Sequence, residues 1–225
     1  MKVLFLLLIS LFLVNSSASE LNTVKYSASY VPKHMSVKTK KERYFALVLP
    51  AITKVHDELM QEYEAIKNDV NKTISTEKIL SLKKRYKVTT DRELLLALKP
   101  HPKSIVIAQG AIESAWGTSR FFRQANNIFG MWSKSRKDKR IAAGIKRGGK
   151  HTIWLRKFDT IEESIRAYYL MIARVSAYKR LRAYRYKTDN VFKIIKGLNK
   201  YAEIGDEYVV ILRKTIRYNN LTNYD

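Results

Sequence analysis

One acidic residue differs from the others in the sequence because of its neighbours. Glu113 lies in the apolar segment 104–116, and it is the only charged residue between Lys103 and Arg120. Among apolar neighbours a carboxyl group loses the hydration that favours its charged form, so burial raises its pKa. A carboxyl that keeps its proton near neutral pH can donate it to a leaving oxygen, as glycoside hydrolysis requires. Glu113 is therefore the first candidate for a general acid.

The size of the required pKa shift indicates its source. A general acid that works near neutrality needs a pKa of roughly 6 to 7, against about 4.3 for free Glu, and two pKa units correspond to about 2.7 kcal/mol. Apolar spacing predicts a buried helix over 104–116, closed by Gly117. This helix puts Glu113 in its last turn and Trp116 on the same face. The helix dipole there supplies only about 0.3–1 kcal/mol, so desolvation must supply most of the shift.

Other common catalytic patterns are missing from the sequence. The histidines, at positions 34, 56, 101 and 151, are never three or four residues apart, and no HExxH motif occurs. No phosphate-binding glycine loop and no GxSxG elbow occurs either. The chain has no cysteine, which excludes disulfides and thiolate-ligated metals. We expect neither a metal nor a cofactor.

Helices must position Glu113, because apolar residues recur at steps of three and four along most of the chain. Pro50 lies inside the first of these stretches, where it should kink the helix or mark its true start. Capping-box spacing begins two others, at Thr90 and at Thr160. The expected helices, besides 104–116, cover 41–70, 75–86, 90–98, 160–175, 190–198 and 207–218.

One segment departs from this helical pattern. Residues 133–157 are basic and contain Gly144, Gly148 and Gly149. Two short runs flank Gly148-Gly149, over 141–147 and 150–157, which predicts a β-hairpin. The fold class expected is mostly α (α+β), and a parallel-sheet enzyme fold is not expected.

The N-terminus has the three parts of a secretory signal. Lys2 precedes an apolar run over 3–14, and small residues up to Ala18 suit cleavage after that position. The run is too short to cross about 30 Å of hydrocarbon comfortably. We therefore expect residues 1–18 to be a signal peptide, 19–40 a linker or arm, and 41–225 the functional domain.

The formal net charge of the chain is +23. Such basicity alone would suggest nucleic acid, but the expected export to the periplasm or cell envelope conflicts with that partner. An exported protein meets anionic envelope surfaces instead, and we expect loose association with them. We also expect a monomer.

The surroundings of Glu113 resemble a known family. The stretches that carry the resemblance are AQGAIESAWGTSRF at 108–121 and NNIFG at 126–130. Together they resemble the glucosaminidase superfamily, glycoside hydrolase family 73. Two later stretches, YAEIGDEYV at 201–209 and RYNNL at 217–221, are similar to its Bax branch, as is the Phe-Asp-Thr at 158–160. The resemblance covers about residues 41–225.

The resemblance implies a lysozyme-like fold, with a helical lobe, a small β-hairpin lobe over about 133–157 and a cleft between them. It implies cleavage of the β-1,4 bond after N-acetylglucosamine in peptidoglycan. Glu113 matches the catalytic acid, and Tyr201 matches a tyrosine beside it. Trp116, Asn127 and Phe129 match residues that shape the floor of the cleft. Four of these residues also fit a structural role. Trp116 and Phe129 could be core residues, Asn127 could cap a turn, and Tyr201 could close the helical lobe.

The second carboxylate of a two-carboxylate mechanism has only weak candidates. Asp138 is the single acid within 132–157, and Asp159 follows this segment but also suits the N-cap of a helix. The substrate's own N-acetyl group could instead act as nucleophile. Two other functions stay open: a catalytically silent glycan-binding or scaffold protein on the same fold, and a lytic transglycosylase.

Overall fold

The computed structural model describes residues 26–225 except 70, 72 and 148–150. The expected signal peptide, the first residues of the expected arm and the centre of the hairpin turn lie outside the described residues. Within the part of the chain that is described, no helix is both long and apolar enough to span a membrane.

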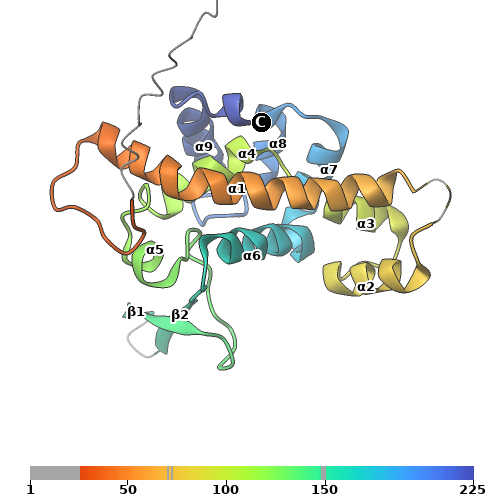
Figure 1. Ribbon diagram of the computed structural model, residues 1–225, viewed down its shortest axis with the longest axis horizontal. Coiled ribbons are helices and arrows are strands. Elements are labelled where there is room, and N and C mark those ends of the chain that lie inside the picture. The colour runs from red at the N-terminus through yellow and green to blue at the C-terminus, as the bar shows by residue number, and fades with distance from the viewer. Residues whose placement is uncertain (1–25, 70, 72, 148–150) are drawn as a thin grey trace, which may run out of the picture.

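Helices make up most of the fold (Figure 1). They are α1 (Val37–Lys67), α2 (Thr76–Tyr86), α3 (Asp91–Leu98), α4 (Lys103–Glu113), α5 (Arg120–Ala125), α6 (Ile161–Arg174), α7 (Lys179–Lys187), α8 (Val191–Ile194) and α9 (Asp206–Tyr218). Three short 3₁₀ helices are η1 (Ser176–Tyr178), η2 (Ile195–Leu198) and η3 (Leu221–Tyr224). The strands β1 (Arg140–Arg147) and β2 (His151–Arg156) form an antiparallel hairpin.

Helix α4 lies among other helices of the fold. In Figure 1, α1 crosses the whole molecule, α6 runs alongside it, and the hairpin projects beyond α5. Helix α4 contacts α1, α9 and η3, and eight of its eleven residues are buried. It therefore passes through the main core, as its almost continuous apolar sequence predicts.

Side chains cap most of the expected helix starts. At α3 the Thr90 hydroxyl accepts from the Glu93 backbone N–H, and the Glu93 carboxylate accepts from the Thr90 backbone N–H, so this capping box is confirmed. At α6 the Thr160 hydroxyl accepts from the Glu163 backbone. Thr160 is thus the N-cap, and the N-cap role considered for Asp159 is wrong because Asp159 lies one residue outside the helix.

Two other expectations about helices need correction. Helix α1 begins at Val37, four residues before the expected start, and continues through Pro50. Pro50 therefore does not mark the start of a helix. Helix α7 was not expected, because its sequence, KRLRAYRYK, is mostly basic and lacks an apolar stripe. It is nevertheless packed inward, because Arg182 and Arg185 are buried and donate to backbone carbonyls.

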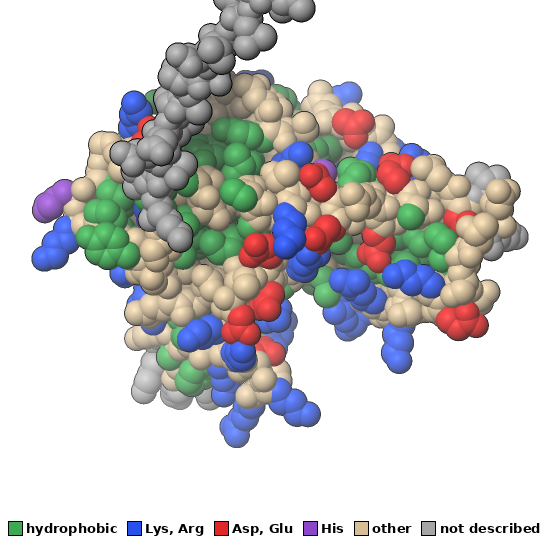
Figure 2. Space-filling model, in the orientation of Figure 1, with side chains coloured by type: hydrophobic (Ala, Val, Ile, Leu, Met, Phe, Trp, Pro, Cys, Tyr) green, Lys and Arg blue, Asp and Glu red, His purple; other side chains and the backbone are tan. Residues whose placement is uncertain are grey.

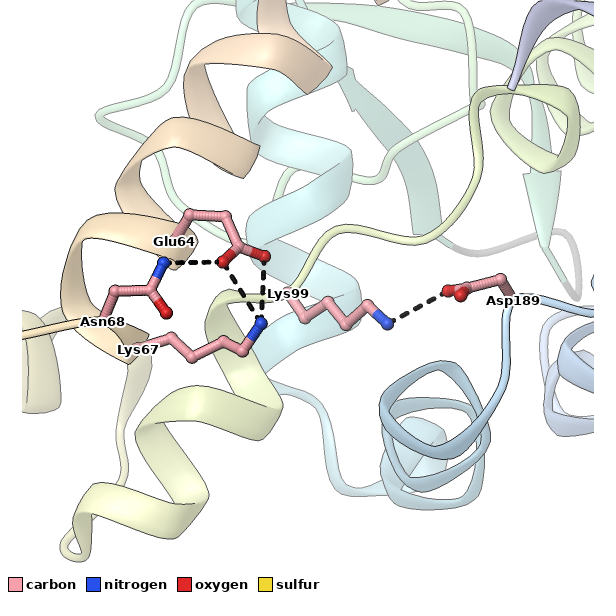
Figure 3. Close-up of polar contacts among 5 residues, drawn as sticks. All are labelled: Glu64, Lys67, Asn68, Lys99 and Asp189. Atoms are coloured by element: carbon pink, nitrogen blue, oxygen red, sulfur yellow. Dashed lines mark hydrogen bonds and ion pairs between the residues drawn. The ribbon is translucent and has the colours of Figure 1, made fainter.

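Exposed polar contacts lie at the ends of some helices (Figure 3). Near the end of α1, Lys67 and Asn68 both donate to the Glu64 carboxylate. Lys99, just after α3, donates to Asp189 between α7 and α8, with 3.1 Å between Nζ and Oδ1. Exposed pairs of this kind contribute about 0–1 kcal/mol each. The buried helix faces, not these pairs, hold the fold together.

The expected fold class, mostly α with a small β-hairpin, is confirmed. The hairpin lies within the expected segment 133–157, and its register pairs Arg140 with Arg156 and Ala142 with Trp154. The register shifts between Ala142 and Lys146, where Gly144 adopts φ +83°. Trp132 extends the pairing through a bridge to Leu155.

Candidate active site around Glu113

Glu113 is the last residue of α4, and its side chain is only partly exposed. Burial raises the pKa of its carboxyl above the ordinary value, and a hydrogen bond from Tyr208 opposes part of that rise. The predicted direction of the pKa shift and its cause, desolvation, are therefore confirmed. A carboxyl in this state holds its proton more tightly than a solvated one.

The chain does not continue as a helix after Glu113. Ala115, Trp116 and Gly117 follow one another with φ of +51°, +59° and +72°. Left-handed backbone is strained for residues other than glycine, at about 1–2 kcal/mol each. The expected helix to Trp116 is therefore wrong, and Trp116 does not share a helix face with Glu113. The tight loop 114–117 sharply ends the helix at the carboxyl.

Two polar residues hold this loop. The buried Ser114 hydroxyl donates to Gly110 O, 2.6 Å away, and accepts from Gly117 N at 2.8 Å. The buried Arg43 guanidinium donates to Gly117 O at 2.8 Å. It also donates to the backbone oxygens of Ser27, Ala28 and Tyr30. Residues 27–30 of the expected arm are thus fastened to the loop that follows Glu113.

Tyr208 is the hydrogen-bond partner that the described residues offer to Glu113. Its hydroxyl donates to Glu113 Oε1 across 3.0 Å. Tyr208 lies in the first turn of α9 and is buried. Burial, followed by the nearby Glu113 carboxylate, raises its pKa far above the ordinary value, so Tyr208 keeps its proton and acts as a donor. It stands in the stretch 201–209 that resembles the Bax branch, which is the signal that could have identified it.

Tyr201, expected beside the acid, stacks on Tyr208, which makes the direct contact with the Glu113 carboxyl. Its ring stacks on that of Tyr208 with 5.3 Å between centroids. Burial raises its pKa well above the ordinary value, and the Glu113 charge adds to this rise. Tyr201 therefore forms part of the wall that surrounds Tyr208, while Tyr208 makes the direct bond.

Trp116 lies at the surface of the loop and faces α9. Its ring packs edge-on against Tyr44, and the Lys41 ammonium sits 5.1 Å above its centre. Trp116 also lines a cavity of about 680 Å³ together with Lys41 and Tyr218. Glu113 is not among the residues that line this cavity, so the expected contact of Trp116 with substrate stays a prediction.

The two other residues matched to the cleft floor are interior. Asn127 is buried and clamps the turn 127–131: its amide donates to Met131 O and Arg156 O, and its carbonyl oxygen accepts from Met131 N. Phe129 is buried and stacks on Tyr168 with 4.1 Å between centroids. Their positions favour support of the site from beneath over direct contact with substrate.

The two candidates for a second carboxylate are both engaged. Asp159 is exposed and forms an ion pair with Lys139, with 2.6 Å between Oδ2 and Nζ. Asp138 accepts from the Ser133 hydroxyl at 2.9 Å. Neither is bonded to Glu113 or to Tyr208 in the described structure. Over the same described residues, no cluster of acidic and His side chains could hold a metal ion.

Comparison with known proteins identifies the family of the chain. Residues 91–221, more than half of the chain, match the glucosaminidase family, described as mannosyl-glycoprotein endo-beta-N-acetylglucosaminidase. The chain belongs to the glucosaminidase family. Within this family it is similar to Protein bax of Escherichia coli K12, at 27% identity over 86% of this chain and 76% of that protein. The Bax branch expected from the sequence is thereby confirmed.

The chain is also similar to solved structures, at lower sequence identity. The catalytic domain of the autolysin Auto from Listeria monocytogenes is 19% identical, with 86% of this chain and 100% of that one covered and a TM-score of 0.49. The glycoside hydrolase domain of FlgJ from Salmonella typhimurium is 19% identical, with 67% and 91% covered and a TM-score of 0.42.

Removal of the Ser114 hydroxyl should loosen the loop after Glu113. In Ser114→Ala the buried Gly117 N–H loses its acceptor, so we expect the free energy of unfolding to fall by about 1–3 kcal/mol. Thr118→Ala, just after the loop, removes a hydroxyl whose bond to Ala115 O is exposed to solvent, and it should change stability by less than about 0.5 kcal/mol. Urea unfolding measures both. Equal losses would show that the Ser114 hydroxyl does not hold the loop.

The raised pKa of Glu113 predicts a dependence of stability on pH. Between the ordinary pKa of 4.5 and the raised folded value, the folded chain binds more protons than the unfolded chain. The free energy of unfolding therefore falls as pH rises through this window. Glu113→Gln cannot lose a proton, so wild type should lose stability relative to this variant as pH rises from 4.5 through the raised pKa of the folded state. Urea unfolding at a series of pH values measures both proteins. If the difference in free energy of unfolding between wild type and Glu113→Gln does not change with pH, the raised pKa is contradicted.

Proposed function

We propose that this protein is a peptidoglycan hydrolase that cleaves the β-1,4 bond after N-acetylglucosamine, with Glu113 as its general acid. One observation carries the proposal: a carboxyl inside the segment that matches the family ends a buried helix, and burial raises its pKa. Such a carboxyl can protonate the glycosidic oxygen as the C1–O bond breaks, which makes the sugar a better leaving group. Tyr208 then stabilises the carboxylate that remains.

The nucleophile in this proposal is the substrate's own N-acetyl group. The acetamido oxygen attacks C1 while the leaving oxygen takes the proton from Glu113. Water then attacks C1, the bond between C1 and the acetamido oxygen breaks so that the N-acetyl group is restored, and the water gives a proton to the Glu113 carboxylate. The acid is thereby regenerated, and two inversions at C1 retain the configuration. The engagement of Asp138 by Ser133 and of Asp159 by Lys139 favours this route over a second protein carboxylate.

The hairpin lobe suits an anionic polymer. Figure 2 shows Lys and Arg side chains gathered where Figure 1 places the hairpin. The described basic side chains of this segment are Lys134, Arg136, Lys137, Lys139, Arg140, Arg156 and Lys157. Peptidoglycan carries carboxylates on its lactyl groups and peptide stems. A basic lobe would attract these groups at low ionic strength and lose that attraction as salt screens it.

The site of action follows from the leader-like sequence. The pattern of residues 1–18 supports export, and the proposed substrate lies outside the cytoplasm. We propose that the mature chain acts as a monomer in the periplasm or cell envelope.

Glu113→Gln should abolish cutting but keep binding. Gln preserves the shape of the side chain and can still accept from Tyr208, but it has no acid proton, so the rate should fall about 10²- to 10⁴-fold. Clearance of a peptidoglycan suspension measures the rate, and co-sedimentation with peptidoglycan measures binding. Glu207→Gln, at an exposed position in α9, is the matched control and should cut at the wild-type rate.

The products separate the proposal from its alternatives. Mass spectrometry should find reducing N-acetylglucosamine ends, whereas anhydro sugar ends would identify a lytic transglycosylase. Wild-type protein that binds peptidoglycan without releasing fragments would instead indicate a silent glycan-binding or scaffold protein.

Replacement of each candidate second carboxylate should leave most of the activity. Asp159→Asn removes a charge that already pairs with Lys139, and Asp138→Asn keeps an acceptor for Ser133. We expect rates within about threefold of wild type, because neither group has a step in the proposed route. The same clearance assay applies. A loss as large as that of Glu113→Gln would assign the second carboxylate and overturn the N-acetyl route.

A further inference from the structure

A continuous row of buried polar groups leads from Arg185 to Glu113. The groups are Arg185 in α7, His101 between α3 and α4, Tyr168 in α6, Gln109 in α4 and Tyr208 in α9. All five side chains are buried. They come from elements far apart in sequence, and nothing in the proposed hydrolysis uses the first four. We call this row the buried relay.

Each link of the relay is a hydrogen bond. Arg185 lies 3.3 Å from His101 Nδ1, and His101 Nε2 lies 2.9 Å from the Tyr168 hydroxyl. The Tyr168 hydroxyl donates to Gln109 Oε1, and Gln109 Nε2 donates to the Tyr208 hydroxyl at 3.1 Å. Tyr208 then donates to Glu113 Oε1 at 3.0 Å.

Arg185 determines the direction of every bond in this row. A guanidinium has donors and no acceptor, so His101 Nδ1 must accept. Burial, with Arg185 beside it, lowers the pKa of His101 well below its usual value, so the ring is neutral and its proton lies on Nε2. His101 therefore donates to Tyr168, and Tyr168 must donate to Gln109 Oε1.

The opposite order of donors and acceptors along the relay is incompatible with Arg185. If the Gln109 amide were turned over, Tyr208 would donate to Gln109, and Tyr168 would donate to His101 Nε2. His101 would then carry its proton on Nδ1, where it would face the N–H donors of Arg185. A buried pair of opposed donors is costly, so this arrangement is excluded.

Further hydrogen bonds hold the Arg185 guanidinium in place beside His101. It donates to Leu96 O and Ala97 O, carbonyls in the last turn of α3, where a cation is favoured by the helix dipole. Burial, followed by repulsion from Arg182, lowers its pKa to about 9. Arg185 therefore keeps its charge at neutral pH and stays a donor.

We infer that the buried relay selects which oxygen of Glu113 carries the acid proton. With Gln109 Nε2 turned toward it, Tyr208 can give its single proton only to Glu113 Oε1. Oε1 is thus an acceptor, and the acid proton resides on Oε2. Arg185, His101, Tyr168 and Gln109 are positioning residues that act through Tyr208. This inference rests on the proposed role of Glu113.

Two neighbouring tyrosines give a matched test of the relay. Tyr168→Phe removes a relay hydroxyl but keeps the ring that stacks on Phe129. Tyr169→Phe removes an equally buried hydroxyl that donates only to the His101 backbone oxygen, outside the relay. We expect Tyr168→Phe to lower kcat about 5- to 30-fold with KM unchanged, and Tyr169→Phe to change neither. Equal effects of the two variants on kcat would overturn the relay.

A double-mutant cycle tests whether the effect travels through Tyr208. After Tyr208→Phe the relay no longer reaches Glu113, so the further change Tyr168→Phe should have almost no effect on kcat. Independent, multiplying effects would show that Tyr168 acts by another route and would overturn the inference. Urea unfolding of each variant verifies that the compared proteins are folded.

NMR tests the relay even without an activity assay. In wild type, ¹⁵N shifts should show His101 as the neutral Nε2–H tautomer, and His101→Gln identifies its signal. The ¹³C shift of the Glu113 carboxyl should move in Tyr168→Phe and stay in place in Tyr169→Phe. An Nδ1–H tautomer, or an unmoved carboxyl signal in both variants, would overturn the relay. Absence of glycan cleavage by wild type would overturn only the proposed function.

Discussion

Helix α4 runs through the middle of the core, so polar groups on it that are shielded from water need partners inside the protein. Its Gln109 and Glu113 are such groups, and each finds a partner in Tyr208. An unpaired buried polar group would cost about 1–3 kcal/mol. The packing of α1, α6 and α9 around α4 therefore has to bring specific hydroxyls to it, and this requirement shapes the site.

The buried cations obey the same constraint in a chain of net charge +23. Arg43, Arg182 and Arg185 are buried, and their hydrogen bonds go to backbone carbonyls and a neutral histidine. A cation beside Glu113 would stabilise its carboxylate and lower its pKa. The raised pKa of Glu113 arises from burial, opposed by Tyr208 alone. The buried arginines thus bond to carbonyl oxygens and to His101, and none of these described side chains forms an ion pair with Glu113.

The loop after Glu113 links the acid to the N-terminal segment. Its left-handed residues Ala115 and Trp116 are strained, and bonds from Ser114 and Arg43 offset this strain. Because Arg43 also binds the backbone at 27–30, this part of the segment expected to be a linker or arm contributes to the support of the site. A helix that simply continued to Trp116 would have no need of this clamp.

Local sequence by itself determined the helix starts at Thr90 and Thr160, the hairpin, and the burial of Glu113, because capping and apolar spacing act over a few residues. It also identified the family through the motif around Glu113. Only the tertiary structure decided that Tyr208, 95 residues away, bonds the acid while Tyr201 stacks behind it. Both tyrosines stand in one motif, and which hydroxyl meets the carboxylate depends on how α9 is rotated against α4. The tertiary structure also decided that α4 ends at Glu113, because Arg43 of α1, far away in sequence, bonds to Gly117 O in the loop that follows.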